Sequence, residues 1–265
     1  MPRRKVTISD VAREAGVSIA TVSRVMHGKV SVSSELAGRV DDAARTLGYR
    51  PSPVARGLAT GRTRMVGVLV PELDNPHFHE IIKAIGAGAE QDGYRMLILE
   101  SEGRPEEPDL AALLYDHADG VVLCSPRMPD DRLRQLAAGR PRLLCVNRIP
   151  TGIGLPFVAF DSFSPMLEIC GLLGRLGHQR VAYLSGPMDS WANAERWRAV
   201  SHAAAFGLEP IRIQAGYTID AGYDAVDAAL EQGVTALVAA NDLCAIGALS
   251  RLRDRGIRVP EDVSL

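Results

Sequence analysis

The stretch Val6–Lys29, VTISDVAREAGVSIATVSRVMHGK, decides the fold of the first part of this chain. Two short helical patterns lie on either side of a turn at Ala15-Gly16-Val17. Thr7 stands at the N-cap position of the first pattern, and Asp10, three residues later, completes a box-like cap. Gly16 can adopt the left-handed backbone that ends a helix and redirects the chain. The stretch therefore predicts a helix-turn-helix, the unit that lays its second helix in the major groove of DNA.

The next residues complete an all-helical head. The second helix opens at Ser18 or Val17, and a third helix is expected from about Ser33 to Leu47, with Ser34 as its cap and Gly48 at its end. The apolar stripe of the third helix is Leu36, Val40, Ala43, Ala44 and Leu47. The core residues expected from the first two helices are Val11, Ala12, Ala15, Val22 and Val25.

Prolines and glycines indicate that the segment after this head forms only a short helix of low stability. Each proline of Tyr49-Arg50-Pro51-Ser52-Pro53 disfavours helix in the residue before it. Ser52-Pro53 then forms a cap with proline at the first helical position, and Val54–Leu58 gives one or two turns. Gly57 lowers the stability of this short helix and Gly61 ends it, so the helix is marginal alone. We expect it to order only against a partner.

From Met65 onward the chain alternates between strands and helices. The expected strands are Met65–Val70, Arg95–Leu99, Gly120–Cys124, Arg142–Val146, Phe157–Phe160, Arg180–Leu184, Ile211–Gln214, Ala236–Ala239 and Val263 onward. The helical patterns between them include His77–Gln91, Asp130–Ala138, Pro165–Leu176, Asn193–Phe206, Ile219–Glu231 and Leu243–Arg255. Such alternation predicts an α/β body with parallel sheets covered on both faces. About 200 residues exceed one typical doubly wound unit. We therefore expect two sheets, with a binding cleft between them at the carboxyl ends of the strands.

Charge separates the head from the body. Residues 1–64 carry 12 Lys and Arg against 5 Asp and Glu, a net charge of +7, whereas the rest of the chain carries −9 within a total of −2. A basic head on an acidic body directs the attraction for DNA onto the head. No apolar stretch reaches the length of a membrane span, and no apolar region follows the basic N-terminus. We expect a cytoplasmic protein without a signal peptide.

The residue patterns point to neither catalysis nor a metal site. The chain has no G-x-S-x-G, H-E-x-x-H, P-loop or Rossmann glycine motif, so we expect no enzyme activity and no cofactor. Cys124, Cys145, Cys170 and Cys244 form no C-x-x-C pair and have no His at metal-ligand spacing. Each lies in an apolar run, which indicates a buried, reduced thiol. These absences also count against an enzyme or a transport-type binding protein whose head is incidental.

A longer series of motifs runs through the whole chain. The head contains T-x-x-D-V-A-x-x-A-G-V-S-x-x-T-V-S-R-V from Thr7 to Val25, then Leu47-Gly48-Tyr49-x-Pro51 and Ala55-Arg56-x-Leu58. Later motifs are Asn75-Pro76, Asp119-Gly120, Asn147-Arg148, Asp161, Gly177-His178-Gln179-Arg180, Gly186-Pro187, Glu195-Arg196, Asn241-Asp242, Ala245-Ile246-Gly247 and Val259–Ser264. In this order they resemble the lactose-repressor (LacI/GalR) family of bacterial transcription regulators. The resemblance implies a periplasmic-binding-protein-like body of two parallel-sheet α/β subdomains that binds a small molecule. It also implies a homodimer that binds a palindromic operator in double-stranded DNA.

The resemblance also sets the expected domain boundaries. They are a helix-turn-helix domain over 1–50, a hinge helix and linker over 51–62, and two effector-binding subdomains over 63–160 and 161–265. Family members continue for several dozen residues beyond the point that matches Leu265, so the resemblance implies that the C-terminal part of the body is missing. The chain is then either a fragment or a product with an incomplete body. An interrupted strand leaves a sheet edge and apolar faces uncovered, which predicts poor solubility.

DNA contacts are implied for the second helix of the head. In the family, the positions of Ile19, Ala20 and Arg24 enter the groove. Arg24 can make a bidentate contact to guanine, whereas Ile19 and Ala20 offer only apolar contacts. The alternative for Arg24 is a solvated surface side chain. The other residues expected to contact DNA here are Thr7, Ser18, Thr21 and Ser23, and His27, which falls where many family members carry Asn.

Leu58 is the residue of the hinge segment to which the resemblance gives most weight. In the family, one such leucine from each protomer wedges into the minor groove at the operator centre, and an apolar wedge unstacks a base step and kinks DNA. The alternative is that Leu58 packs on its own domain. Ala55 is small enough to let the backbone approach the groove floor, and Ser52 completes the hinge residues expected at the DNA.

In the body, the resemblance assigns effector-binding residues to positions at or just beyond strand ends. They are Asn75, His77, Phe78, Ser125, Asp161, Ser190, Arg196, Tyr217 and Asn241. Charged and amide groups with an aromatic platform suit a sugar or a purine. Alternatives remain for two of these residues. Asp161 is equally well a helix N-cap, and Arg196 is alternatively the partner of Asp189 or Glu195 in a structural ion pair.

The sequence thus predicts a repressor whose operator affinity is controlled by a small molecule. Ser190 stands at a position where a purine-type relative has Arg, which favours a sugar inducer. One alternative is a regulator that responds to a purine or another corepressor. Another is a truncated product that retains only DNA binding. The choice between a dimer and a tetramer stays open.

Overall fold

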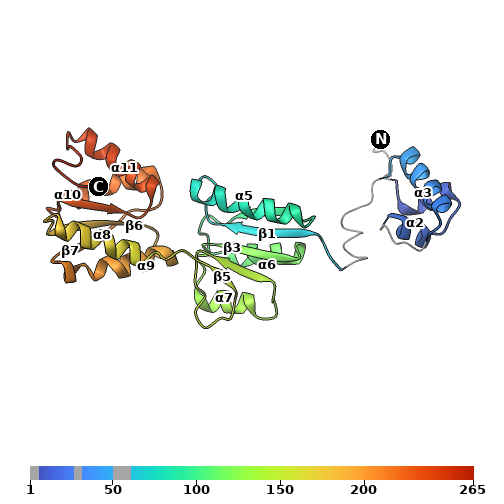
Figure 1. The fold of residues 1–265 in the computed structure, drawn as a ribbon, viewed down its shortest axis with the longest axis horizontal. Helices are drawn as coiled ribbons and strands as arrows, with labels where there is room; N and C mark the ends of the chain where they lie inside the picture. The colour runs from blue at the N-terminus through green and yellow to red at the C-terminus, as the bar shows by residue number, and fades with distance from the viewer. Residues whose placement is uncertain (1–5, 27–31, 50–60) are drawn as a thin grey trace. The chain divides into compact units, whose positions relative to one another are not determined.

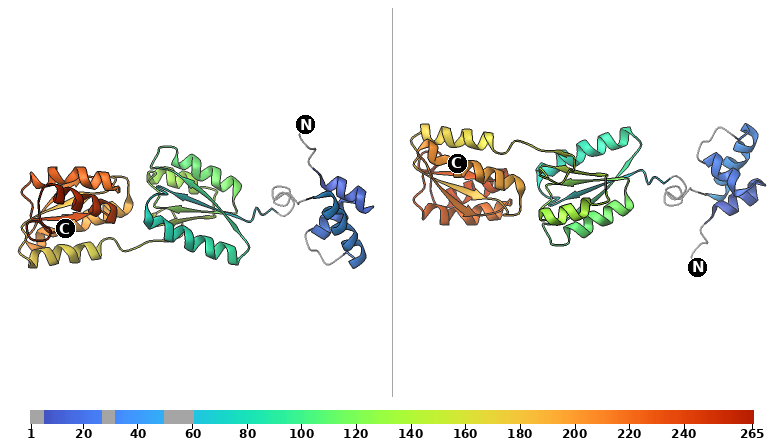
Figure 2. Two further views of the ribbon diagram at one scale, coloured as in Figure 1. Left: turned by 90° about the horizontal axis from the view of Figure 1, so that it is seen from above. Right: turned by 90° about the horizontal axis from the view of Figure 1, so that it is seen from below.

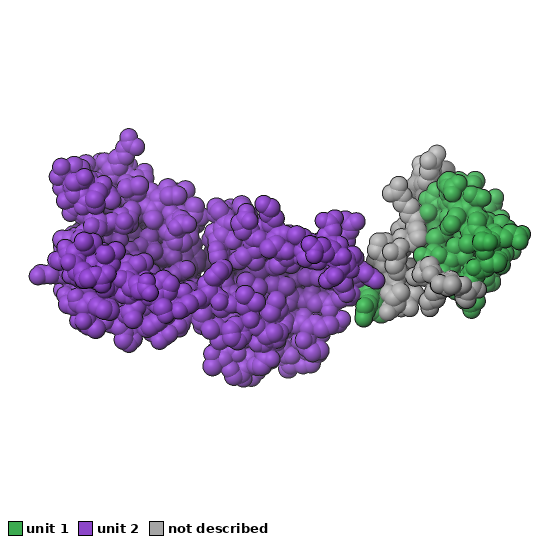
Figure 3. Space-filling model, viewed as in Figure 1, with its two compact units in different colours: residues 1–63 green, residues 64–265 purple. Residues whose placement is uncertain are grey.

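The computed structural model describes residues 6–26, 32–49 and 61–265. The chain divides into two units, Met1–Thr63 and Arg64–Leu265, which are coloured separately in Figure 3. Four of the expected DNA contacts, His27, Ser52, Ala55 and Leu58, lie outside the described residues, as does most of the expected hinge helix.

Residues 6–26 and 32–49 of the first unit contain the expected three helices of the head. They are α1 (Ile8–Ala15), α2 (Ile19–Met26) and α3 (Ser34–Leu47). The backbone N–H and the hydroxyl of Thr7 both donate to the carboxylate of Asp10, at 3.0 and 2.8 Å, so the prediction that Asp10 caps α1 is confirmed. Gly16 ends α1 in the left-handed conformation, with φ of 64°. The hydroxyl of Ser18 accepts from the backbone N–H of Thr21 at 3.1 Å, which opens α2.

The apolar faces of these helices meet in one core. Its buried residues are Val11, Ala12, Ala15, Val22, Val40, Ala43 and Ala44, with Val25 and Leu47 packed against them. The cap of α3 is Ser33, whose extended backbone lets its hydroxyl accept from the N–H of Leu36, so the prediction of Ser34 was wrong by one residue. Arg39 of α3 donates from Nη2 to the carbonyl of Ala15 at 2.6 Å. This bond satisfies a carbonyl at the end of α1 and ties α3 to the turn.

The second unit begins with a lobe built on a five-stranded parallel sheet in the order β2-β1-β3-β4-β5. Its elements are β1 (Met65–Val70), α5 (Pro76–Gln91), β2 (Arg95–Glu100), α6 (Glu107–His117), β3 (Gly120–Cys124), α7 (Asp130–Ala137), β4 (Leu143–Val146) and β5 (Phe157–Val158). We call these elements the first lobe. Helix α5 covers one face of the sheet, and α6 and α7 cover the other (Figure 1). Side chains alternate accordingly along β1, where Val68 and Val70 face α5 and Leu69 faces α6.

The remaining elements form a second lobe on a three-stranded parallel sheet in the order β7-β6-β8. They are α8 (Ser164–Arg175), β6 (Arg180–Ser185), α9 (Trp191–Ser201), a 3-10 turn (Ala203–Phe206), β7 (Glu209–Gln214), α10 (Ile219–Leu230), β8 (Ala236–Ala239) and α11 (Asp242–Asp254). Helices α8 and α9 cover one face, while α10 and α11 cover the other. Residues 159–163 lead from β5 into α8 (Figure 2).

The predicted α/β body with two parallel sheets is confirmed, and three details differ. Strand β5 ends at Val158 rather than Phe160, because the chain leaves the sheet there to enter the second lobe. The strand expected from Val263 onward is a single bridge between Ala236 and Ser264. Helix α6 was absent from the predicted helices, since Pro108 and three charged residues obscure its N-terminus.

Two glycines let α10 and α11 approach each other closely. A Cβ built on Gly247 would lie 1.8 Å from the carbonyl oxygen of Ile219, and one built on Gly222 would lie 2.0 Å from the carbonyl oxygen of Cys244. The clashing atoms belong to the backbone, so neither helix can accommodate a side chain by rotating a rotamer. The pair therefore packs as one layer against the sheet.

Replacing Gly247 with Ala should destabilise the second unit by about 1–3 kcal/mol, because the new methyl group forces the helices apart. Gly88→Ala on α5 is the matched control, since a Cβ at Gly88 meets no atom within 4 Å. That control should stabilise the protein by up to about 1 kcal/mol through helix propensity. Urea unfolding measures both changes, and equal stability of the two variants would contradict the close approach of α10 and α11.

Candidate functional site

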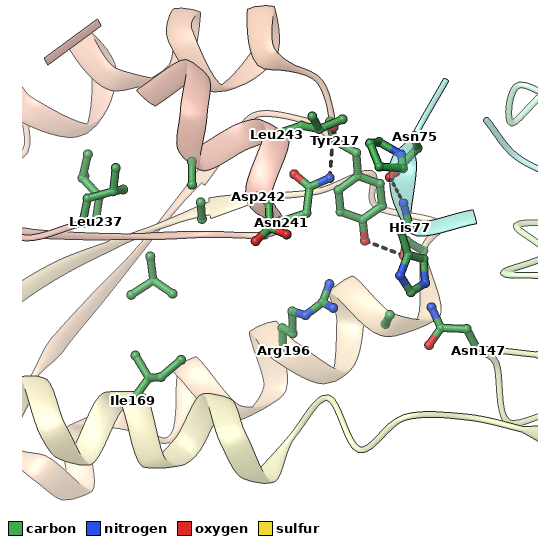
Figure 4. Close-up of a pocket in the computed structure, with 18 of the residues that line it drawn as sticks. Asn75, His77, Asn147, Ile169, Arg196, Tyr217, Leu237, Asn241, Asp242 and Leu243 are labelled. Atoms are coloured by element: carbon green, nitrogen blue, oxygen red, sulfur yellow. Dashed lines mark hydrogen bonds between the residues drawn. The ribbon is translucent and has the colours of Figure 1, made fainter. Parts of the chain in front are cut away.

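The second unit contains a pocket of about 940 Å³ at the carboxyl ends of strands from both sheets. Asn75 follows β1, Ser125 follows β3 and Asn147 follows β4. From the second lobe, loops or helices that follow β6, β7 and β8 contribute Ser190, Arg196, Tyr217, Asn241 and Asp242. Figure 4 shows ten labelled residues of this pocket, with polar groups at one end and aliphatic side chains such as Leu237 and Ile169 at the other. The structure thus brings eight of the nine predicted effector residues to one cavity.

Asn75, His77 and Phe78 form the wall contributed by the end of β1. The Asn75 side chain caps α5 by accepting from the backbone N–H of His77 at 3.1 Å. Phe78 is buried beneath the sheet edge, and His77 lies edge-on to Phe160 with ring centroids 6.1 Å apart. Burial, and then the positive charge of Arg196, lower the pKa of His77. The shift favours the neutral imidazole, which carries one donor and one acceptor.

Ser125 and Asn147 hold an unusual backbone at the ends of neighbouring strands. Both have left-handed conformations, with φ of 45° and 59°. The amide of Asn147 donates to the hydroxyl of Ser125 at 3.1 Å, which joins the two strand ends. Such strained residues cluster at functional sites, where the surrounding structure enforces them. Asn147 was not among the predicted effector residues, although it stands directly after a strand and belongs to the Asn147-Arg148 motif.

In the second lobe, helix caps fix three of the predicted residues. Ser190 caps α9 and shares a hydrogen bond of 2.8 Å with the hydroxyl of Tyr217. Asn241 caps α11 through its side-chain oxygen, which accepts from Cys244 N at 2.9 Å, while its amide donates to the carbonyl of Tyr217 at 3.0 Å. The two caps therefore hold Ser190 and Asn241 at the pocket, and each of them is hydrogen-bonded to Tyr217.

A fully buried amide supports this wall from behind. The side-chain oxygen of Asn193 accepts from Tyr183 and from Gly186 N, each at 2.8 Å. Its amide donates to the carbonyls of Gly186 and Pro187 at 3.1 Å. These bonds fix the loop that carries Ser190. Asn193 could not be recognised from the sequence, because it lies inside a helix and its bonding partners are not its neighbours in the chain.

Arg196 and Asp242 present opposite charges to the same cavity from α9 and α11. Arg196 points into the cavity in Figure 4 and is half-buried. Within residues 61–265, no ion pair or hydrogen bond occupies its guanidinium. Glu195, one of its two alternative partners, instead pairs with Arg198 at 2.6 Å. The structural ion pair proposed as the alternative for Arg196 is therefore absent.

Asp161 is the one predicted effector residue that does not line the pocket. Its exposed carboxylate accepts from the backbone N–H groups of Phe163 and Ser164, at 2.9 and 3.0 Å. A bond from the Ser164 hydroxyl, and then these two backbone bonds, lower the pKa of Asp161. The carboxylate thus holds the turn that leads into α8, whose N-cap position is Phe163.

The loop after β3 carries a further pocket residue, Arg127, which the prediction omitted. The buried carboxylate of Glu107 accepts from the backbone N–H groups of Arg127 and Met128, at 2.9 and 2.5 Å. On the other side, Arg148 donates to the carbonyls of Pro126 and Met128, at 2.8 and 2.6 Å. Glu107 therefore holds the backbone N–H groups of this loop, and Arg148 holds its backbone carbonyls. The pattern Ser125-Pro126-Arg127 directly after a strand was an available signal for Arg127.

The described part of the chain gives no sign of metal or membrane chemistry. It contains no group of three or more His, Cys, Asp or Glu side chains that could hold a metal ion. The four cysteines are free and buried, as predicted. Burial raises the pKa of Cys124 to about 12 and that of Cys145 to about 11. No helix of the described residues has the length and apolar character needed to cross a membrane.

In the head, the second helix exposes both apolar and polar side chains. Ile19 has 51% of its surface exposed, and Ala20 and Arg24 are also exposed. The hydroxyls of Ser18 and Thr21 share a hydrogen bond of 2.9 Å at the start of the helix. Ser23 is half-buried on the same helix, and Thr7 is exposed at the start of α1.

Comparison with known proteins identifies the chain. Residues 7–52 match the model of bacterial regulatory proteins of the lacI family. Residues 63–265 match the model of periplasmic binding proteins and the sugar-binding domain of the LacI family. The chain belongs to the LacI family. The predicted resemblance and fold class are confirmed, and the protein is a DNA-binding transcriptional regulator with a body of the sugar-binding type.

Individual relatives are similar over almost the whole chain. Catabolite control protein A of Priestia megaterium is 31% identical over 270 residues, which are 98% of this chain and 81% of that protein. The transcriptional repressor CytR of Escherichia coli K12 is 31% identical over 267 residues, 98% of this chain and 78% of that repressor. Among solved structures, the lac repressor dimer bound to operator and the anti-inducer ONPF is 26% identical, with a TM-score of 0.82 over 98% of this chain and 81% of that one. The regulator CelR in complex with cellobiose is 30% identical, with a TM-score of 0.64 over the same shares of the two chains.

The buried carboxylate of Glu107 predicts a specific pH dependence. Burial raises its pKa above the usual value of 4.5, although the two backbone donors oppose the shift. A raised folded-state pKa contributes stability that is fully present below pH 4.5 and is lost as the pH rises through the folded pKa. Relative to Glu107→Gln, the wild-type protein should lose unfolding free energy with rising pH, at most about 1.4 kcal/mol per pH unit.

Chemical unfolding between pH 4.5 and pH 8 measures this difference, with exposed Glu106→Gln as the control from the adjacent position. The control should run parallel to the wild type. A constant stability gap between wild type and Glu107→Gln across this range would show that Glu107 ionises as an ordinary carboxylate.

Proposed function

We propose that this protein is a transcriptional repressor whose affinity for operator DNA is set by a sugar bound in the pocket between the two lobes. The observation that carries the proposal is the convergence of hydrogen-bonding side chains from six strand ends on one cavity, in a chain that also carries a helix-turn-helix. We propose no catalytic activity for it. We expect it in the cytoplasm, where operator DNA lies.

The chemistry of the lining supports a sugar. A sugar ring presents several hydroxyls that each donate and accept, and the amides of Asn75, Asn147 and Asn241 can do both in return. Arg196 adds a donor fork and Asp242 an acceptor, and neither is consumed by an ion pair with the other. The ring of Tyr217 supplies a flat apolar face for the carbon skeleton. Ser190, a neutral hydroxyl tied to Tyr217, leaves this wall without a further cation.

The effector residues that we propose are Asn75, His77, Phe78, Ser125, Ser190, Arg196, Tyr217 and Asn241, to which we add Asn147 and Asp242. Asp161 has a weaker case, because its carboxylate already holds the turn before α8. The cellobiose held by CelR and the ONPF held by the lac repressor are in keeping with a carbohydrate ligand.

At the DNA end, we propose that Arg24 reads a base edge and that Ile19 and Ala20 contribute apolar contacts in the major groove. Thr7, Ser18, Thr21 and Ser23 then suit contacts to phosphate, and His27, Ser52, Ala55 and Leu58 complete the expected interface. A homodimer bound to a palindromic operator is proposed on the same grounds, and the lac repressor is a dimer on its operator.

We further propose the domain boundaries given by the sequence, 1–50, 51–62, 63–160 and 161–265. The division of the chain after Thr63 and the passage between lobes at residues 159–163 support them. Regulation is then a coupling free energy between ligand binding in the pocket and operator binding by the head. In this proposal the two lobes have two arrangements, and a ligand shifts their populations because it binds one more tightly than the other.

A thermal-shift titration tests the ligand proposal with cellobiose, lactose and hypoxanthine as probes. We expect at least one sugar to raise the melting temperature of the wild-type protein, and Arg196→Ala to weaken its apparent affinity by about 10- to 150-fold, because a charged hydrogen bond is lost. Arg198→Ala on the same helix is the matched control, since Arg198 lies outside the pocket. A response to hypoxanthine alone would replace the sugar with a nucleobase. Equal effects of the two arginine variants would remove Arg196 from the site.

The DNA proposal is tested with Arg24→Ala. Loss of a bidentate contact to guanine should cost about 1–3 kcal/mol on the operator and leave nonspecific binding nearly unchanged. Binding is measured on operator and random duplexes at one fixed salt concentration, because the phosphate contribution varies steeply with salt. A uniform loss on both duplexes would assign Arg24 to the phosphate backbone.

A further inference from the structure

Arg127 and Tyr217 come from different lobes and meet in the pocket. The guanidinium carbon of Arg127 lies 5.8 Å from the ring centroid of Tyr217, within range of a cation–π contact. Arg127 follows β3, whereas Tyr217 follows β7. Within residues 64–265, it is the one ring contact, ion pair or hydrogen bond found between the elements of the two lobes.

The first lobe holds Arg127 at both its backbone and its side chain. Glu107 and Arg148 clamp its loop, as described above. The carboxylate of Glu72 pairs with Nη2 of the guanidinium, and only 9% of the Arg127 side chain is exposed. A Cβ built on Gly103 would lie 2.9 Å from Nη1, so glycine leaves the space that the guanidinium occupies. Arg127 therefore meets the other lobe with little freedom to move.

The second lobe holds Tyr217 in a similar way. Its hydroxyl is bonded to Ser190 at 2.8 Å, and its carbonyl accepts from Asn241 at 3.0 Å. The ring packs over Gly186, where a Cβ would lie 2.3 Å from Cε1. Two fixed groups thus face each other across the pocket.

The Nε of Arg127 is buried and has no hydrogen-bond partner. A buried donor without an acceptor carries a free-energy cost, which a new partner for Nε would relieve. The contact with the Tyr217 ring favours joined lobes, and a single cation–π contact contributes little free energy. A small difference between two arrangements is what allows a ligand to shift their populations.

We infer that Arg127 is a positioning residue that joins the two lobes, and that its contact with the Tyr217 ring sets the ratio of joined to separated lobes. Both residues line the pocket, so any ligand that enters it acts on this contact directly. The inference holds whether or not the ligand is a sugar.

The experiment measures the distance between lobes in the full chain by double electron–electron resonance. Spin labels are attached at Asp131→Cys on α7 and Glu231→Cys after α10, both exposed positions. The four native cysteines are buried and react slowly. Arg127→Ala and Tyr217→Leu should each shift the ratio of joined to separated lobes by roughly 2- to 30-fold, the range expected for a cation–π contact.

Further variants separate this role from a general loss of structure. The double variant should shift the ratio no further than either single variant, because both remove the same contact. Arg127→Lys keeps a cation over the ring and should lie between wild type and Arg127→Ala. Arg140→Ala is the matched control, because Arg140 lies 5.7 Å from the Tyr115 ring within the first lobe and should leave the distance unchanged.

Thermal unfolding checks that each variant remains folded. A distance distribution of folded Arg127→Ala that superimposes on the wild type would overturn the inference. An equal shift in Arg140→Ala would overturn it as well, since the effect would then not depend on a contact between lobes. Additive shifts in the double variant would show that the two residues act separately.

Discussion

Every strand of both sheets pairs in parallel with its neighbours. The position of the pocket depends on this parallel pairing. Parallel strands all end at the same edge of their sheet, so residues that are far apart in the sequence meet there. Asn75, Ser125 and Asn147 follow three different strands of one lobe, and Ser190, Tyr217 and Asn241 follow three strands of the other. Polar side chains that cap helices at these ends gather around one cavity.

The sequence was sufficient wherever the determining interaction is local. The Thr7–Asp10 cap, the left-handed Gly16 and the alternation of strands and helices follow from neighbouring residues, and the structure contains all three. The pocket residues at strand ends came from the family resemblance, and eight of those nine residues line the cavity. The family motifs then supplied the function, which the matches over residues 7–52 and 63–265 support.

Other parts of the site depend on contacts between residues distant in the sequence. Glu107 can be recognised as a clamp only when its carboxylate is seen against the backbone N–H groups of Arg127 and Met128. Asn193 looks like any helical residue until Tyr183 and Gly186 are placed beside it. The left-handed backbones of Ser125 and Asn147 are likewise enforced by the surrounding lobe and not by their own residue types. Such residues cannot be recognised from the sequence, because the sequence does not show which distant residues they contact.

The close approach of α10 and α11 at Gly222 and Gly247 has a consequence for ligand size. Tyr217 stands just before α10, and Asn241 and Asp242 stand at the start of α11. Because the backbones of these two helices lie in close contact, the second lobe alone sets the spacing between the aromatic ring and these polar groups. A ligand that touched both would have to fit that spacing whatever the position of the first lobe.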